Sequence, residues 1–348
     1  MNRSLKDVID ENREKLETMS FNGVSKITMV FLSIFVLGCA GLSFYWDSEP
    51  DLFTVRDNQA SILLKLARKP VTGSATITTM ITMADILLHK PGGYLSNDLS
   101  PPGSLMDNIP NWEFGVLVQL RDMARTLRNN LSRSQSQSQE DADLVTAENQ
   151  FYFDNEKWIF PESESEYQKA ITALSDYLLR LGDERQSSAQ FYARADNLRN
   201  WLSEVETRLG NISQKLSASV GKRQLDTALA GDSSANQSTV TDKELELKTP
   251  WSELDDVFYQ ARGTTWALIH LLSAVEIDFA DVLEKKNATV SLQQIIRELE
   301  PTQDALWSPV ILNGSGLGIL ANHSLVMASH VSRANAALID LRRLLEQG

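Results

Sequence analysis

A stretch of twenty residues without a charged side chain, Ile27 to Trp46, constrains this chain more than any other feature. As an α-helix it would be about 30 Å long, which matches the thickness of the hydrocarbon core of a bilayer. The stretch ends in Phe44-Tyr45-Trp46, and aromatic rings of this kind favour the membrane–water interface. The sequence therefore predicts a single transmembrane helix over residues 27–46, in contact with a lipid bilayer.

The charges beside this stretch predict its orientation. Residues 1–26 contain five basic side chains, whereas the other flank opens with Asp47, Glu49 and Asp51. Because basic residues stay on the cytoplasmic side of a membrane, we expect residues 1–26 to form a cytoplasmic tail. Residues 47–348 then lie outside. In a Gram-negative bacterium this describes a single-pass inner-membrane protein with a periplasmic C-terminal domain.

Two other interpretations of the N-terminus remain open. A cleaved signal peptide would have a shorter apolar core and small residues at its cleavage site. A lipoprotein signal is suggested by Val36-Leu37-Gly38-Cys39, in which Cys39 would carry the lipid, although the apolar stretch continues past it. We favour an uncleaved signal anchor. Cys39 is the only cysteine, so residues 47–348 form no disulfide.

Apolar residues recur at helical spacing over most of the remaining chain. The clearest stripes run over residues 77–88, 116–131, 167–181, 191–216, 254–282 and 320–345. The last stripe alternates steps of four and three residues, a spacing typical of coiled-coil packing. Long helices with one apolar stripe bury it against one another. The sequence thus predicts an all-α fold, an antiparallel helical bundle over residues 47–348.

Three segments depart from the helical pattern. The aromatic runs 151–153 and 158–160 flank Asp154-Asn155, and together they favour one short β-hairpin near residues 151–160. Residues 132–149 contain a Ser/Gln-rich run followed by acidic residues, and residues 230–243 are rich in Gly, Ser, Asn, Thr and Asp. Such compositions are typical of solvated segments, so we expect flexible loops near 132–149 and 230–243.

Charge and residue content exclude several classes of function. With 33 Lys+Arg and 46 Asp+Glu the net charge is −13, so we expect no nucleic-acid partner. The four histidines are not spaced three or four residues apart and there is no cysteine pair, so the sequence predicts no metal site. No cofactor motif and no nucleophile motif is present, and no catalytic residue is predicted.

Two aromatic segments are candidate sites. Tyr192, Arg194, Arg199 and Trp201 fall within three helical turns, and arginines beside aromatic rings bind a carboxylate, a phosphate or a sugar face. The alternative is that these arginines tie the helix to carboxylates of its neighbours. The Pro/Gly-rich segment 90–103 predicts a rigid loop, which either only connects two helices or presents Tyr94 and Trp112 to a partner.

Five strings carry a resemblance to a known family. They are Lys90–Asp98, Pro110–Val116, Ser132–Ser136, Phe191–Trp201 and Ala321–Ala328. With the N-terminal apolar helix, they resemble a bacterial membrane-protein family known only as domain of unknown function 2333. The resemblance extends from about residue 45 to the end and implies a Gram-negative envelope protein. It implies no activity and no catalytic residue.

The function that these observations favour is a non-enzymatic binding or scaffolding module of the bacterial envelope. Its partner would be an unidentified envelope protein, and a homo-oligomer is compatible with the sequence. One alternative is an envelope hydrolase that uses a carboxylate pair, since acidic residues cluster at 253–256 and 276–281. A second alternative is a helical-bundle ligand sensor. It would act through a partner chain, because a tail of 26 residues is too short to carry a signal onward.

Overall fold

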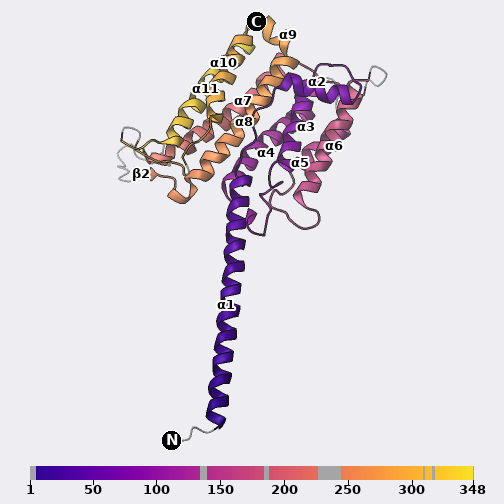
Figure 1. Ribbon diagram of the computed structural model, residues 1–348. Coiled ribbons are helices and arrows are strands. Elements are labelled where there is room, and N and C mark those ends of the chain that lie inside the picture. The colour runs from indigo at the N-terminus through magenta and orange to yellow at the C-terminus, as the bar shows by residue number, and fades with distance from the viewer. Residues whose placement is uncertain are drawn as a thin grey trace, which may run out of the picture.

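The computed structural model consists of one long helix that leads into a bundle of helices (Figure 1). It describes residues 5–133, 139–183, 188–225, 244–308, 310–315 and 318–347. Helix α1, Leu5–Trp46, is continuous over 42 residues. Its Ser25–Trp46 part has a mean hydropathy of 2.2, and none of its most apolar window is buried in the rest of the molecule. The helix is long and apolar enough to span a membrane or to serve as a signal sequence.

The remaining elements are helical apart from one small ribbon, which confirms the predicted all-α fold with one N-terminal apolar helix. The α-helices are α2 Val55–Lys65, α3 Ser74–His89, α4 Asn108–Thr126, α5 Ala142–Phe151, α6 Ser163–Leu181, α7 Ala195–Ser217, α8 Leu254–Asp278, α9 Ala280–Lys285, α10 Thr289–Leu299 and α11 His323–Glu346. Short 3-10 turns lie at Gly103–Leu105, Ala218–Val220, Trp251–Glu253 and Glu300–Gln303, and a π-turn lies at Leu127–Leu131.

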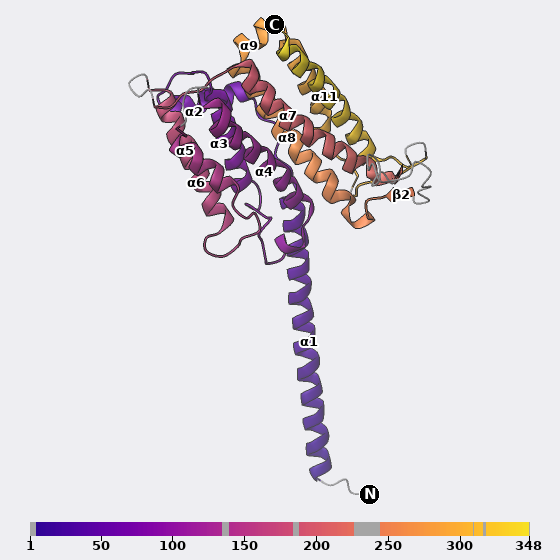
Figure 2. The same cartoon turned by 180° about the vertical axis from the view of Figure 1, so that it is seen from behind.

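The long helices alternate in direction, which gives the bundle two ends (Figures 1 and 2). We call the end from which α1 leaves the basal end. The described residues of four connections lie there: 90–107, 152–162, 218–225 with 244–253, and 300–322 without 309, 316 and 317. The distal end carries 66–73, 279–288 and the described residues of 127–141 and of 182–194, together with the end of α11. The indole of Trp46 lies against Gly92, so the end of α1 touches the first basal connection.

Helix α8 is the central element, because it contacts α3, α4, α7, α10 and α11. Its residues from Ala261 to Leu272 are all buried. Helices α4 and α8 approach backbone to backbone at two glycines. A Cβ atom on Gly263 would lie 2.0 Å from the carbonyl oxygen of Trp112, and one on Gly115 would lie 2.3 Å from that of Gln260. The close approach lets Trp112 and Trp266 pack with ring centroids 5.1 Å apart.

A buried carboxylate fixes the distal ends of α3 and α8. Asp278 Oδ1 accepts a hydrogen bond from the amide of Gly73 at 2.8 Å, and Asp278 Oδ2 accepts one from the amide of Thr76 at 2.7 Å. These amides lie at the start of α3, where no residue of the same helix can accept from them. The side chain at the end of α8 therefore caps α3, which itself begins at a glycine.

The prediction of a β-hairpin near residues 151–160 is wrong. Phe151 ends α5 with its ring buried against Tyr167, and the chain then turns through 152–162 without a strand. Asp141 accepts hydrogen bonds from the amides of Asp143 and Leu144, which starts α5 and makes Phe151, the first residue of the first aromatic run, the last residue of a helix. The ribbon forms instead between β1, Lys222–Leu225, and β2, Glu244–Leu247, which pair antiparallel.

The two predicted loops have different outcomes. Within 132–149 the chain is helical from Ala142 onward, because α5 occupies that part. Residues 134–138 of this range, and the whole range 230–243, lie outside the residues that the structure describes.

The crossing of α4 and α8 generates a prediction about stability. Gly263→Ala should lower the free energy of unfolding by about 2–3 kcal/mol, because the new methyl group collides with backbone that no side-chain rotation can move. Gly210→Ala is the matched control, since Gly210 lies inside helix α7 and a Cβ there would meet only Asn335 at 3.9 Å. It should leave stability unchanged or raise it by about 0.5–1 kcal/mol. Denaturant unfolding of both variants in detergent measures the difference, and equal effects would contradict the close crossing.

Candidate functional site

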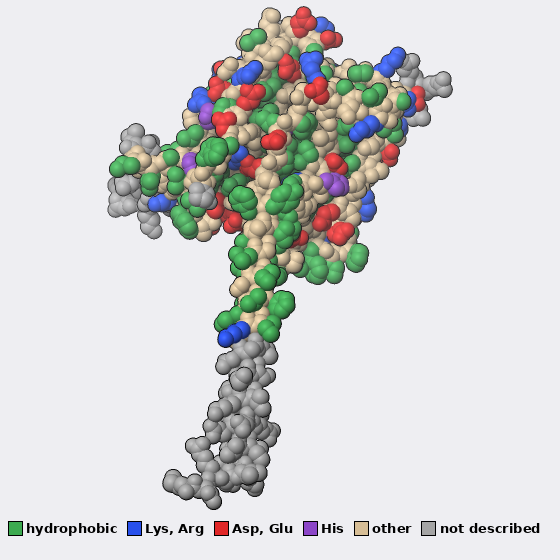
Figure 3. Space-filling view, viewed as in Figure 1, with side chains coloured by type: hydrophobic (Ala, Val, Ile, Leu, Met, Phe, Trp, Pro, Cys, Tyr) green, Lys and Arg blue, Asp and Glu red, His purple; other side chains and the backbone are tan. Residues whose placement is uncertain are grey.

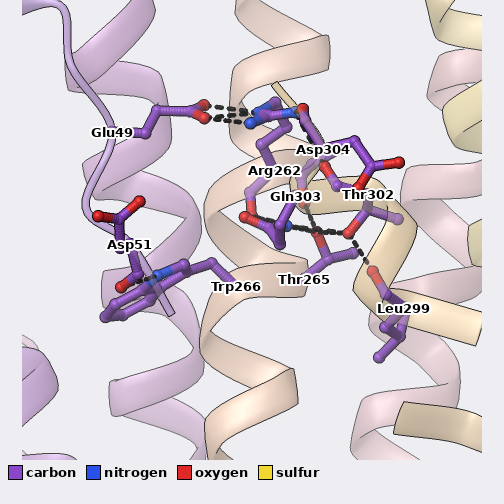
Figure 4. Close-up of polar contacts among 10 residues, drawn as sticks. Glu49, Asp51, Arg262, Thr265, Trp266, Leu299, Thr302, Gln303 and Asp304 are labelled. Carbon is purple, nitrogen blue, oxygen red and sulfur yellow. Dashed lines mark hydrogen bonds and ion pairs between the residues drawn. The ribbon is translucent and has the colours of Figure 1, made fainter. Parts of the chain in front are cut away.

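An extended segment, residues 47–54, joins α1 to α2 and lies along α8; we call it the strap (Figure 4). Three of its residues contact three residues of α8. Glu49 pairs with Arg262. The carbonyl oxygen of Asp51 accepts a hydrogen bond from Trp266 Nε1 at 3.4 Å.

The third contact lies one helical step further along α8. The amide of Phe53 donates to His270 Nε2 at 3.0 Å, and the two rings stack with centroids 3.9 Å apart. The contacting strap residues are thus two positions apart, and their partners on α8 are four positions apart. Two residues of extended chain advance about 6.6 Å, and four residues of α-helix rise about 6.0 Å. The two repeats match closely enough for the strap to follow the helix in parallel.

The strongest of the three contacts is that of Arg262, whose side chain is buried. Its Nε donates to both carboxylate oxygens of Glu49 at 2.7 Å, and its Nη2 also donates to Glu49. Its Nη1 donates to the carbonyl oxygens of Thr302 and Asp304, each at 3.0 Å. One guanidinium therefore joins the strap, α8 and the connection before α11 (Figure 4). Such charge-assisted, two-point hydrogen bonds are among the strongest in proteins.

A pocket of about 790 Å³ opens beside this junction at the basal end. Its lining includes three carboxylates, of Asp47, Glu49 and Asp51. The single cation in the lining, Arg262, is already paired with Glu49. The local charge is therefore negative.

Aromatic rings and one free acceptor complete the wall of the pocket. The rings are those of Phe44, Tyr259, Trp266 and Trp307. The side-chain oxygen of Asn108 is buried and has no hydrogen-bond partner among the described residues. Carboxylates, aromatic faces and a free acceptor together suit a ligand with a positively charged hydrogen-bond donor.

Burial raises the pKa of two groups in this pocket. It raises the pKa of Asp47, an effect that the hydrogen bond from Asn108 opposes and the charge of Glu49 reinforces. It also raises the pKa of the Tyr259 hydroxyl, helped by the charges of Glu49 and Asp47. A bound cation would favour the charged form of Asp47.

His270 is held neutral at the end of the strap. Because its Nε2 accepts from the amide of Phe53, its Nδ1 carries the proton and donates to the carbonyl oxygen of Trp266 at 2.8 Å. Burial lowers the pKa of His270 from its ordinary value near 6.5 to about 4. Protonation would remove the acceptor for Phe53.

The predicted ligand-binding residues lie on α7 and the connection before it, at the distal end. Arg194 stacks on the ring of Tyr192, with its guanidinium carbon 5.6 Å from the centroid. Arg199 pairs with Glu346 at the end of α11, at 3.7 Å. The side chain of Trp201 is 2 % exposed and belongs to the core. Of the four, only Trp201 lines a described pocket, one of about 300 Å³, so the structure brings Tyr192 and Arg194 into contact but does not gather all four around one pocket.

The predicted partner-binding residues are buried. Tyr94 is 3 % exposed and Trp112 is 0 % exposed, so neither is presented on the surface and that interpretation is wrong. The loop that contains Tyr94 is built around a buried ion pair. Lys90 Nζ lies 2.5 Å from Glu113 Oε1, and the amides of Leu95 and Ser96 donate to the same carboxylate.

The strap and its pocket were missed by the sequence analysis, although the sequence contains a signal for them. Arg262 is the only Lys or Arg between Lys248 and Lys285, inside a strongly apolar stripe. Trp266 and His270 follow it at steps of four, so three polar or aromatic side chains share one face. No described group of three or more His, Cys, Asp or Glu side chains is arranged to hold a metal ion.

Comparison with known proteins places the chain in a family. The family model described as an uncharacterized protein conserved in bacteria (DUF2333) matches residues 19–348. The chain belongs to this family. The matched range of DUF2333 includes the apolar part of α1, the strap and α8, and it confirms the resemblance seen in the sequence. No curated protein and no solved structure matches the chain.

His270 generates a prediction about pH. Its folded-state pKa lies below its unfolded value, so the folded protein binds fewer protons and the neutral ring stabilises the fold fully only above about pH 6.5. As the pH falls toward 4, the free energy of unfolding of the wild type should decrease by up to about 3 kcal/mol through this histidine. His270→Gln should not show this decrease, because glutamine can still accept the hydrogen bond from Phe53 but does not titrate. Denaturant unfolding across this pH range measures the difference.

His89→Gln is the control for this experiment, since it removes an exposed histidine at the end of α3. It should keep the pH dependence of the wild type. If His270→Gln also kept that dependence, the strap would not depend on the neutral imidazole.

Proposed function

We propose that the protein is a single-pass envelope protein whose helical domain is a non-enzymatic binding module held at the membrane by α1. Three observations support an anchor over a cleaved signal. The family match begins at residue 19 and so includes the apolar span. Trp46, the last residue of α1, packs against Gly92 of the domain. The strap that follows is bound to α8 at three points.

In this proposal residues 1–26 are cytoplasmic, residues 27–46 cross the inner membrane, and residues 47–348 form a periplasmic domain. The five basic residues before the span, against the acidic Asp47, Glu49 and Asp51 directly after it, support this orientation. Cys39 lies inside the span, where a small apolar side chain is well accommodated.

The observation that carries the binding role is the acidic, aromatic-walled pocket beside the strap. We propose that it receives a positively charged group, such as a basic side chain from a segment of another envelope protein. The pocket lies where α1 enters the domain, so a bound segment would be held close to the membrane surface.

A hydrolase is the weaker candidate for the same pocket. The raised pKa of Asp47 favours it, because a general acid must be protonated at working pH. However, Glu49 is engaged by Arg262, which leaves Asp47 and Asp51 as the two lining carboxylates that could form a carboxylate pair. A sensor remains a variant of the binding role, in which the strap would pass the effect of a ligand to α1 and then to a partner chain.

The pocket can be tested with a short lysine-rich peptide as a probe. Calorimetric titration of full-length protein in nanodiscs should detect binding that weakens with added salt, because charge attraction drives it. Asp47→Asn combined with Asp51→Asn should reduce the affinity about tenfold or more, which corresponds to about 1.4 kcal/mol. Asp340→Asn is the control, since Asp340 is a highly exposed carboxylate on α11. Equal affinity in the pocket variant and the wild type would contradict the proposal.

The orientation can be tested with reporters fused after Gly348. Alkaline phosphatase is active only outside the cytoplasm and should be active in this fusion, whereas a cytoplasm-dependent fluorescent protein should remain dark. The opposite pattern would place the domain in the cytoplasm and remove the periplasmic assignment. Alkaline extraction of the same membranes distinguishes an integral anchor, which stays in the pellet, from a cleaved and released domain.

A further inference from the structure

Exposed apolar side chains gather at the basal end of the bundle. All four basal connections contribute to this surface, which we call the basal face. Its most exposed members include Leu105, Trp158, Phe160, Trp251, Trp307 and Ile319. The side chain of Phe160 is 92 % exposed and that of Trp307 is 96 % exposed. Figure 3 shows hydrophobic side chains gathered at the lower edge of the domain beside α1.

The distal end does not share this character. No large apolar side chain is exposed among the described residues of the four distal connections. Leu64 and Val290, which are exposed near that end, lie singly in α2 and α10. Scattered exposed apolar residues are ordinary in proteins, but a one-sided concentration of them marks a surface that is covered in use.

The first two basal connections lie beside the end of α1 and are joined to each other. Trp46 lies against Gly92 in the first connection. The side-chain amide of Asn97 in that connection donates to the carbonyl oxygen of Lys157 at 2.9 Å, which holds the second connection beside it. Phe44-Tyr45-Trp46 has the composition of an interfacial aromatic belt. If α1 crosses a membrane, these connections lie at the membrane–water interface.

The part of the basal face that contains Trp251 and Trp307 is held at the same end of the bundle. The side-chain amide of Asn111 at the start of α4 donates to Asp256 at the start of α8, at 2.8 Å, which holds the start of α8, just after the 3-10 turn Trp251–Glu253, against the start of α4. Trp307 lines the junction pocket together with Phe44 of α1. The connections that carry these exposed side chains therefore lie at the end of the bundle from which α1 leaves the domain (Figures 1 and 2).

We propose that the basal face rests in the outer interfacial layer of the bilayer that α1 crosses, with Trp158, Phe160, Trp251 and Trp307 inserted among the lipid headgroups. This inference rests on the proposed membrane anchor. The domain is then not a free body on a tether but lies flat against the membrane. Tryptophan favours this layer because its ring is largely apolar and carries one polar N–H, and phenylalanine adds apolar area that lipid can cover.

Apolar burial, and not charge, drives this docking. The basal connections contain exposed acidic residues, among them Asp107, Glu156 and Glu162, which anionic headgroups would repel. Because α1 tethers the domain, docking is an intramolecular step at a high effective concentration, so even a weak interfacial affinity keeps the face on the lipid. The contact should therefore resist added salt.

Site-specific labels can test the inference in the full-length chain. Cys39→Ser removes the only cysteine, and single cysteines are then introduced in place of Phe160 or Trp251 and labelled with an environment-sensitive fluorophore. In vesicles of phosphatidylethanolamine and phosphatidylglycerol, both labels should emit at shorter wavelength. Lipids with a nitroxide near the headgroup should quench them by about twofold or more.

Matched controls use the other end of the molecule and the anchor. Leu64→Cys and Val290→Cys carry the label at side chains that are 82 % and 76 % exposed, and these labels should remain unquenched. Phe35→Cys carries the label inside the apolar span of α1 and should be quenched by lipids with a nitroxide deeper in the acyl chain. All introduced cysteines replace exposed side chains, so the fold should be retained.

The outcomes distinguish failure of the proposed membrane anchor from failure of the proposed docking of the basal face. If the label at residue 35 is not quenched, the anchor itself fails and the proposed membrane topology falls with it. If residue 35 is quenched but residues 160 and 251 are not, the anchor stands and the docked basal face is overturned. If residues 160 and 251 are shielded from aqueous iodide and still not quenched by lipid, a second copy or another protein covers the face, which also overturns the inference.

Discussion

The Arg262 guanidinium is the interaction on which the arrangement of this molecule depends. It connects an extended segment, the central helix and the connection before the last helix by hydrogen bonds to Glu49, Thr302 and Asp304. A buried arginine without these acceptors would be costly, so the three elements must be in place together. The position of α1 relative to the bundle follows, because the strap and the contact of Trp46 join them.

The central helix can hold this junction because its other faces are already fixed. Gly263 follows Arg262 directly and brings α4 into backbone contact, while Trp266 packs on Trp112. At the far end Asp278 caps α3. Helix α8 therefore combines a glycine contact, an aromatic contact and two polar contacts along its length, and it supplies one wall of the pocket at its basal end.

The sequence was sufficient for the class of fold, the apolar helix and the family, because all three depend on local pattern. The helical spacing of apolar residues can be recognised without knowing which helices pack together. The hairpin near residues 151–160 failed because the cap at Asp141 and the burial of Phe151 favour a helix there. The apolar side chains of the run 158–160 do not pack into a sheet or a core, because they lie exposed on the surface.

The candidate site could not be predicted in the same way. Tyr94 and Trp112 were candidate surface residues because they lie in or near a Pro/Gly-rich segment. The buried ion pair between Lys90 and Glu113 instead holds that segment against the core. The strap joins positions about 215 residues apart, such as Phe53 and His270, and no local rule pairs them. The sequence does contain one signal, the lone Arg262 in an apolar stripe. This pattern predicts that the arginine has a buried partner, but it does not identify the partner.

The parallel course of the strap has a mechanical consequence. A pull on α1, away from the domain, would draw residues 47–54 lengthwise along α8. The contacts of Glu49, Asp51 and Phe53 would then be loaded together in shear, and none could be peeled off ahead of the others. A junction of this geometry transmits tension from the long helix directly into the middle of the bundle.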